Sequence, residues 1–242
     1  AGIIKPGVPI VLAPNPAEVE EIVRATAAAR RATLVAAGDG TDVTSSFEEG
    51  RLTLRLETPR GRYGPVTLGL RGRHQLANAL TMVRLAETID ATTAIGIPPS
   101  AIESGLRDVD WPGRLQLVTW QGATVLVDGA HNPSGARALA AYVSEVYGRL
   151  PFVFAAMRDK DIAGILAPLA PVMTSLTLTT ISTPRAASFA ELDAAAARAA
   201  PGVPRSHAAS PLEAIDRAAQ GGTTVAVAGS LYLAGDVLAA LS

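Results

Sequence analysis

Residues 125–241 alternate between short apolar runs and helical segments, and this alternation restricts the fold more than any other feature of the chain. The apolar runs lie at 125–127, 152–155, 176–180 and 225–228. Helical periodicity covers 135–147, 162–169, 189–199, 211–219 and 231–241. Strands that alternate with helices form βαβ units. We therefore predict an α/β fold here, with a Rossmann-like, mostly parallel sheet.

Residues 1–106 are organised differently. The segments are, in order, an apolar run at 8–13, a helical segment at 17–31, an apolar run at 33–37 and a polar stretch without a period at 38–50. Residues 51–57 alternate between polar and apolar side chains, which is the pattern of a half-buried strand. We predict that they pair with residues 65–70 across a turn at 59–64, as an antiparallel hairpin insert.

Two helices are predicted to follow this insert. Apolar residues recur at helical spacing over 75–89, and a shorter helix follows Pro98-Pro99, with Ser100 as a candidate N-cap. The polar, turn-rich stretch 107–113 comes next. We place a domain boundary at its start, so the predicted domains are residues 1–106 and 107–242.

Composition and charge exclude several classes of protein. The net charge is −1 over 242 residues, which argues against a nucleic-acid partner. No apolar run reaches the roughly 18 residues of a membrane span. The chain has no Cys and three His, so a thiolate site is excluded and a multi-histidine zinc site is hard to build. We expect a soluble, cytoplasmic protein with no metal site in these residues.

A phosphate-binding loop of the form GxxxxGK[ST] is missing from the chain. That loop needs a Lys followed by Ser or Thr. Only two lysines occur, and Lys5 precedes Pro6 whereas Lys160 precedes Asp161.

Ligands gather at the carboxyl ends of strands in an open parallel sheet, so the loops after the predicted strands are candidate sites. The first loop holds Asp128 and His131 and leads into a helix. Asp128 could accept from a ribose hydroxyl or hold a metal, and His131 could donate to a carboxylate or move a proton. We favour a functional role for these two residues. For Asn132 and Pro133 we favour a helix cap and a first helical position.

Two further loops leave two interpretations open. The charged segment 157–161, which includes Lys160, could orient a substrate carboxylate or form a solvated cap in which Asp161 begins the next helix. Gly229-Ser230 could bind an anion through backbone N–H groups and the Ser hydroxyl, or Ser230 could be an ordinary N-cap.

Other candidates lie outside these loops. His74, Gln75 and Asn78 begin the helix at 75–89. The amides could read a purine edge or make a helix-end hydrogen bond, and for His74 we favour a structural cap over a ligand contact. Arg114, at the predicted boundary, carries five fixed donors that suit a phosphate, or it forms a salt bridge. His207 has no assigned role.

The order of several motifs resembles one family over the whole chain. The motifs are AGIIKPG at 1–7, GRHQxxNA at 72–79, WPGR at 111–114, DGAHNP at 128–133, DKD at 159–161 and GSLY at 229–232. Together they resemble folylpolyglutamate synthase and the bifunctional dihydrofolate synthase of bacteria, which are members of the Mur ligase superfamily. WPGR and DGAHNP are specific as a pair.

The resemblance implies an ATP-dependent ligase that joins L-glutamate to folate or dihydropteroate through an acyl phosphate. By family position, Asn78 is an adenine contact, with His74 and Gln75 beside it in the ATP site. Arg114 and Asp128 are implied to contact the nucleotide, and His131, Ser230 and Lys160 the glutamate. Arg114, Asp128 and His131 are the implied catalytic residues, and a monomer is the implied state.

Family members also carry a phosphate-binding loop, Mg²⁺ ligands and a carbamylated Lys ahead of the AGIIKPG segment. We therefore expect a piece of a longer protein, although a natural short chain stays open. Residues 1–106 would be the back half of a P-loop-type ATPase domain, and 107–242 the Mur ligase C-terminal domain, inactive without the rest. The alternatives are a non-catalytic glutamate- or nucleotide-binding module and a ligase for a cell-wall precursor.

Overall fold

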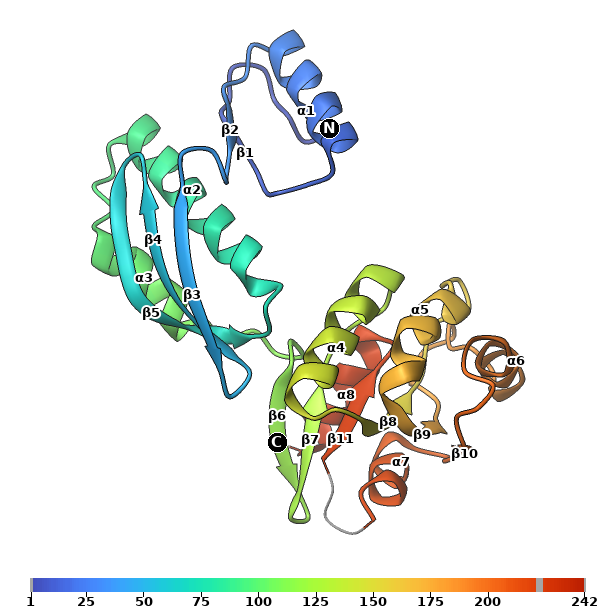
Figure 1. The fold of residues 1–242 in the computed structure, drawn as a ribbon. Coiled ribbons are helices and arrows are strands. Elements are labelled where there is room, and N and C mark those ends of the chain that lie inside the picture. Colours follow the sequence, from blue (N-terminus) through green and yellow to red (C-terminus); the bar gives the residue numbers. More distant parts are fainter. Residues whose placement is uncertain (1, 221–223, 242) are drawn as a thin grey trace. The chain divides into compact units, whose positions relative to one another are not determined.

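A computed structural model describes residues 2–220 and 224–241 (Figure 1). The chain divides into two compact units, Ala1–Asp110 and Trp111–Ser242. The division falls four residues after the predicted boundary, because α3 (Pro99–Asp108) continues through residue 107. The assignment of the two parts to an ATPase domain and a ligase domain stays a prediction.

The first unit contains a small parallel sheet and a larger antiparallel one. β1 (Ile10–Leu12) pairs in parallel with β2 (Leu34–Ala36), and α1 (Ala17–Ala29) connects them. The antiparallel sheet has the order β3 (Asp42–Glu48), β4 (Arg51–Thr58) and β5 (Gly61–Arg71). The buried leucines of β4 pack with apolar residues of α2 (Gln75–Thr93) and α3. The predicted antiparallel hairpin is therefore confirmed, but its turn is shorter than the expected 59–64, because β5 already begins at Gly61.

Three expectations for this unit were wrong. β3 lies in the stretch that was expected to be irregular; only Val43 and Phe47 on it are half-buried, so its apolar pattern is weak. Ser100 is not the N-cap of α3, because the helix begins at Pro99 and Pro98 occupies the cap position. His74 occupies the N-cap position of α2, but its side chain makes no capping hydrogen bond.

The second unit is built on a six-stranded sheet of order β10-β9-β8-β11-β7-β6. Its strands are β6 (Gln116–Trp120), β7 (Ala123–Val127), β8 (Leu150–Phe154), β9 (Met173–Leu178), β10 (Arg205–His207) and β11 (Val225–Ala228). Every pairing is parallel except that between β6 and β7. The mostly parallel α/β sheet is confirmed, whereas β6 and β10 were not predicted.

The helices of this unit follow the predicted segments closely. They are α4 (Pro133–Val146), α5 (Ile162–Leu169), α6 (Phe189–Ala199), α7 (Pro211–Ala218) and α8 (Leu231–Leu241). The chain moves outward from β7 through β8 and β9 to β10, and then returns to β11 in the middle of the sheet (Figure 1). α7 and α8 bury apolar side chains against one face of β7, β8 and β11. No helix in the described ranges is both long and apolar enough to cross a lipid bilayer.

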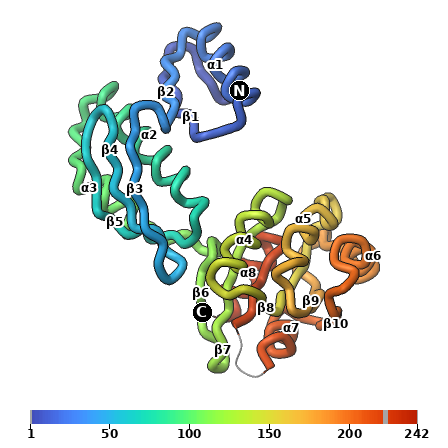
Figure 2. The backbone as a smooth tube through the Cα atoms, viewed as in Figure 1, coloured from blue at the N-terminus to red at the C-terminus, as the bar shows by residue number. Residues whose placement is uncertain are grey.

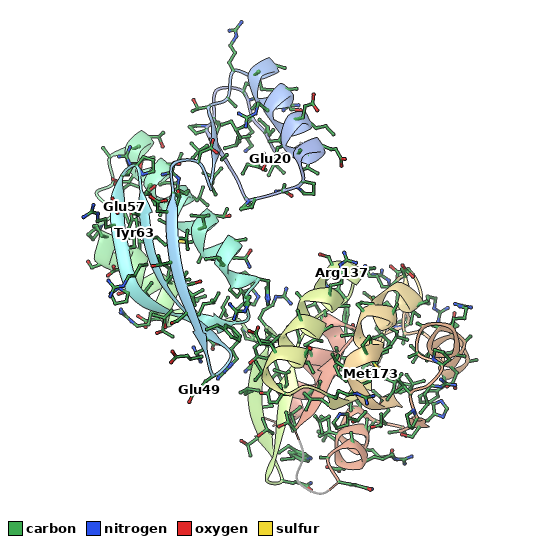
Figure 3. The ribbon with its side chains drawn as sticks, in the orientation of Figure 1. Glu20, Glu49, Glu57, Tyr63, Arg137 and Met173 are labelled. Carbon is green, nitrogen blue, oxygen red and sulfur yellow. The ribbon has the colours of Figure 1, made fainter. Side chains whose placement is uncertain are left out.

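A buried polar network joins the hairpin of the first unit to α2. The Glu87 carboxylate accepts hydrogen bonds from the Tyr63 hydroxyl (2.8 Å), from the Thr58 hydroxyl and from Arg84 Nη1 (2.9 Å). Arg84 and Glu87 are 8% and 4% exposed, so their charges depend on each other. Burial and the bond to Glu87 raise the pKa of Tyr63, which is labelled in Figure 3.

We expect Glu87→Gln to lower the free energy of unfolding of the first unit by about 3 kcal/mol, because it leaves the Arg84 charge buried and uncompensated. Hydrogen exchange at the slowest amides of β4 and α2 measures this. Glu57→Gln is the matched control, since Glu57 pairs with Arg62 (2.8 Å) at an exposed position and its loss should change stability little. Equal effects of the two substitutions would contradict the role of the network.

Candidate functional site

Four loops meet at one edge of the six-stranded sheet. β7, β8 and β11 are parallel, so the segments that follow them leave the sheet at the same edge. β6 runs the opposite way, and Gln116 at its start pairs with Val127 at the end of β7. The WPGR segment therefore lies beside the DGAHNP loop. Figure 2 shows the chain turning directly from β6 into β7.

Asp128 connects these two segments through its carboxylate. Oδ2 accepts the backbone N–H of Leu115 (3.0 Å), and Oδ1 accepts the backbone N–H of Ala130 (2.9 Å). The Gly129 N–H also donates to the Gly113 carbonyl (2.8 Å). Burial raises the pKa of Asp128, and the two backbone donors oppose that rise. The carboxylate thus has a positioning task whatever else it binds.

Gly129 allows three segments to approach closely. A Cβ at this position would collide with Leu231 at the start of α8 and would lie 2.8 Å from Arg114 Nη1. Gly229 has a φ of 111°, and its N–H donates to the Ala130 carbonyl (2.9 Å). The structure therefore brings the predicted site residues Arg114, Asp128 and Ser230 together around the DGAHNP loop.

His131 is half-buried in the same loop. Its Nδ1 lies 2.9 Å from the Gly129 carbonyl, which can only accept, so Nδ1 carries the proton and Nε2 is the acceptor nitrogen in the neutral ring. The following residues form the predicted helix start. Asn132 Oδ1 accepts the Gly135 N–H (2.8 Å), and Pro133 is the first helical residue, so both expectations are confirmed.

Ser230 is only 1% exposed and acts as a helix cap. Its hydroxyl accepts the Tyr232 N–H (3.1 Å) at the start of α8. This observation agrees with the N-cap interpretation. The hydroxyl proton is still available to donate, so a second role in binding stays a prediction.

Lys160 lies in the loop after β8, which also leaves the sheet at this edge. Asp161 Oδ1 accepts the Gly164 N–H (2.9 Å), so Asp161 begins α5 as expected. Lys160 is half-buried, and its ammonium makes no ion pair or hydrogen bond within the described part of the chain.

His74, Gln75 and Asn78 form their own group at the start of α2. Gln75 Nε2 lies 3.0 Å from His74 Nε2, and Asn78 Nδ2 donates to Gln75 Oε1 (2.8 Å). Gln75 is buried, whereas His74 and Asn78 are exposed. Gln75 therefore orients the two exposed side chains, and an adenine contact by Asn78 stays a prediction.

Within residues 2–220 and 224–241, no group of three or more His, Cys, Asp or Glu side chains is placed to hold a metal ion. Two groups that shape the site, the Leu115 N–H and the Gly113 carbonyl, were not predicted from the sequence. Both belong to the entry into β6. The two-residue Gln121-Gly122 turn after Trp120 was the local signal for that hairpin.

Residues 113–231 match the family model described as Mur ligase, glutamate ligase domain. Most of the second unit is therefore similar to the C-terminal domain of Mur ligases. Over most of its length, the chain is homologous to folylpolyglutamate and dihydrofolate synthases, and the resemblance drawn from the motif order is confirmed.

Two curated relatives are dihydrofolate synthase/folylpolyglutamate synthases. The one from Bacillus subtilis is 30% identical over 198 residues, which are 79% of this chain and 45% of the relative. The one from Mycobacterium tuberculosis is 36% identical over 150 residues, or 61% of this chain and 31% of the relative. The chain thus spans less than half the length of these relatives.

Solved structures give the same assignment of the fold. Mycobacterium tuberculosis folylpolyglutamate synthase, complexed with ADP and AMPPCP, has a TM-score of 0.86 at 28% identity, over 97% of this chain and 55% of that one. The bifunctional synthase of Yersinia pestis, complexed with AMPPNP and Mn ion, has a TM-score of 0.79 at 25% identity, over 99% and 54%. These relatives bind a nucleotide, and the second also a divalent metal.

We expect Asp128→Asn to lower the free energy of unfolding of the second unit by about 1–3 kcal/mol. Asn keeps one acceptor oxygen and turns an amide N–H toward a backbone N–H, which leaves a buried donor unpaired. Urea unfolding followed by Trp fluorescence measures this, since both Trp residues lie in the second unit. Asp161→Asn is the control, because Asn is an equally good N-cap. A midpoint unchanged by Asp128→Asn would contradict the role of Asp128 in joining the two segments.

Proposed function

We propose that this chain is the C-terminal portion of an ATP-dependent ligase that adds L-glutamate to folate or dihydropteroate. The observation that carries the proposal is the edge of the Mur ligase domain, where Arg114, Asp128 and Ser230 meet around one loop. His131 lies on that loop, and Lys160 lies on the loop after β8, which starts at the same edge of the sheet. We infer the substrates from the homology to folylpolyglutamate synthases.

The proposed reaction has two steps. The substrate carboxylate attacks the γ-phosphoryl group of ATP, which releases ADP and forms an acyl phosphate. The glutamate amine then attacks the acyl carbon, the C–O bond to phosphate breaks, and an amide forms with loss of a proton. An Arg guanidinium stabilises charge that develops on phosphoryl oxygens, and this is the role we assign to Arg114.

The remaining roles follow the chemistry of each side chain. We assign His131, Ser230 and Lys160 to the incoming glutamate, because they supply donors and a cation for its carboxylates. Asp128 would contact the nucleotide with the lone pairs that its two backbone donors leave. The first unit would contribute His74, Gln75 and Asn78 to ATP binding, as the back half of the ATPase domain.

Phosphoryl transfer from ATP uses Mg²⁺, which neutralises charge on the phosphates. Among the described residues, no group of three or more His, Cys, Asp or Glu side chains is placed to bind this ion, and we assign no step to a metal site there. We place the Mg²⁺ ligands in the part of the ligase that corresponds to the uncovered half of the relatives. A monomeric state and a cytoplasmic location stay predictions.

Two alternatives are weaker. The homologues are folate ligases, which weighs against a cell-wall precursor as substrate. They are also enzymes, which weighs against a binding module without catalysis. A separable glutamate site within the second unit is nevertheless compatible with the proposal, and it can be tested directly.

The 242-residue chain alone is expected neither to hydrolyse ATP nor to release phosphate in the presence of glutamate and dihydropteroate, because the proposed Mg²⁺ and phosphate-binding elements lie elsewhere. A coupled phosphate assay measures this, with the complete Bacillus subtilis relative as the positive control. Glutamate-dependent phosphate release by the purified chain would show that these residues suffice.

Calorimetry with L-glutamate tests the glutamate site. Ser230→Ala is expected to weaken binding about tenfold, since a hydrogen bond to a charged group is lost, whereas Arg114→Ala should leave it unchanged. Ser210→Ala is the matched control, because it removes another N-cap, that of α7, at a residue that is not among the proposed glutamate contacts. Equal weakening by the two Ser substitutions would point to lost stability instead of a lost contact.

A further inference from the structure

The loops that follow β8 and β9 are joined by backbone hydrogen bonds. The segment 156–158 runs beside the segment 185–187 as a short antiparallel ladder. Its contacts are the Arg158 N–H on the Arg185 carbonyl (3.0 Å), the Ala187 N–H on the Ala156 carbonyl (2.9 Å) and the bridge between Met157 and Ala186. The loop after β9 therefore supports the turn that carries Lys160.

An ion pair reinforces this ladder, and it joins Arg185 to Asp159, the residue that follows Arg158. Arg185 Nη2 lies 2.7 Å from Asp159 Oδ2. The hydrogen bond from Arg185 holds the pKa of Asp159 below its ordinary value. Arg158 adds weaker bonds from its guanidinium to the carbonyls of Ala186 (3.2 Å) and Pro184 (3.4 Å).

These contacts decide what surrounds the Lys160 ammonium. The two carboxylates that flank Lys160 in sequence both have other partners, since Asp159 binds Arg185 and Asp161 caps α5. The backbone N–H of Lys160 donates to the Met157 carbonyl (3.1 Å), and this hydrogen bond closes the turn. The Lys160 charge also helps to lower the pKa of Asp159, so this carboxylate already lies within electrostatic reach of the ammonium. An Asp159 released from Arg185 would be free to pair with Lys160 and to compete with a ligand carboxylate.

We propose that Arg185 is a positioning residue for Lys160: by binding Asp159 and bracing the 157–161 turn, it keeps the ammonium available for a carboxylate of the incoming amino acid. We assign Arg185 no contact of its own with the substrate. The inference rests on the proposed function for its ligand, but the ordering of the turn by Arg185 is a property of this chain alone.

The test combines hydrogen exchange with L-glutamate calorimetry on the 242-residue chain. Arg185→Glu sets a like charge against Asp159, so the Arg158 and Lys160 amides should exchange faster and glutamate affinity should fall about three- to fivefold. Arg185→Lys should retain most of both. Arg217→Glu is the matched control, because it breaks a similarly exposed ion pair, with Glu213, and changes the net charge equally.

The decisive comparison is made in a Lys160→Ala background. There, Arg185→Glu should cause no further loss of glutamate affinity, because the residue through which it acts has been removed. Additive losses, or exchange in the 157–161 turn that does not respond to Arg185→Glu, would overturn the proposal. Failure of the unmodified chain to bind L-glutamate would instead count against the proposed glutamate site, and the exchange measurements would still decide whether Arg185 orders the turn.

Discussion

The carboxylate of Asp128 is the contact on which the arrangement of the second unit's site depends. A buried carboxylate is costly unless its oxygens are hydrogen-bonded, and both oxygens here accept backbone N–H groups. One donor belongs to the entry of β6 and the other to the loop after β7. These two hydrogen bonds therefore fix the backbone beside Arg114 and beside His131. The close packing at Gly129 holds the start of α8 against the same loop.

Most of the second unit's elements were predictable because their signals are local. Apolar runs marked the central strands, and the Asn132 and Asp161 caps marked two helix starts. The strands that were missed, β3, β6 and β10, each lie at the edge of a sheet. An edge strand pairs on one side only and carries more polar residues, so its sequence shows little of the apolar pattern that identifies a buried strand.

The site was predictable only in part, for a similar reason. The candidate residues directly follow strands, and the ends of those strands can be predicted from the apolar runs in the sequence. The contacts that orient them join residues far apart in the chain, as Arg185 and Asp159 do, and no local pattern encodes such a pair. Ser100 failed as a cap because the two prolines before it already impose the backbone of a helix start.

The position of β11 has a consequence for how the second unit is assembled. β7 and β8 follow each other along the chain but never touch as neighbours in the sheet, because residues 225–228 fill the space between them. Until that strand is made, a nascent polypeptide has two apolar strands with open hydrogen-bonding edges. Nearly the whole second unit must therefore be synthesised before the central pairings of its sheet can form. We expect a product truncated before β11 to be bound by chaperones or degraded by proteases.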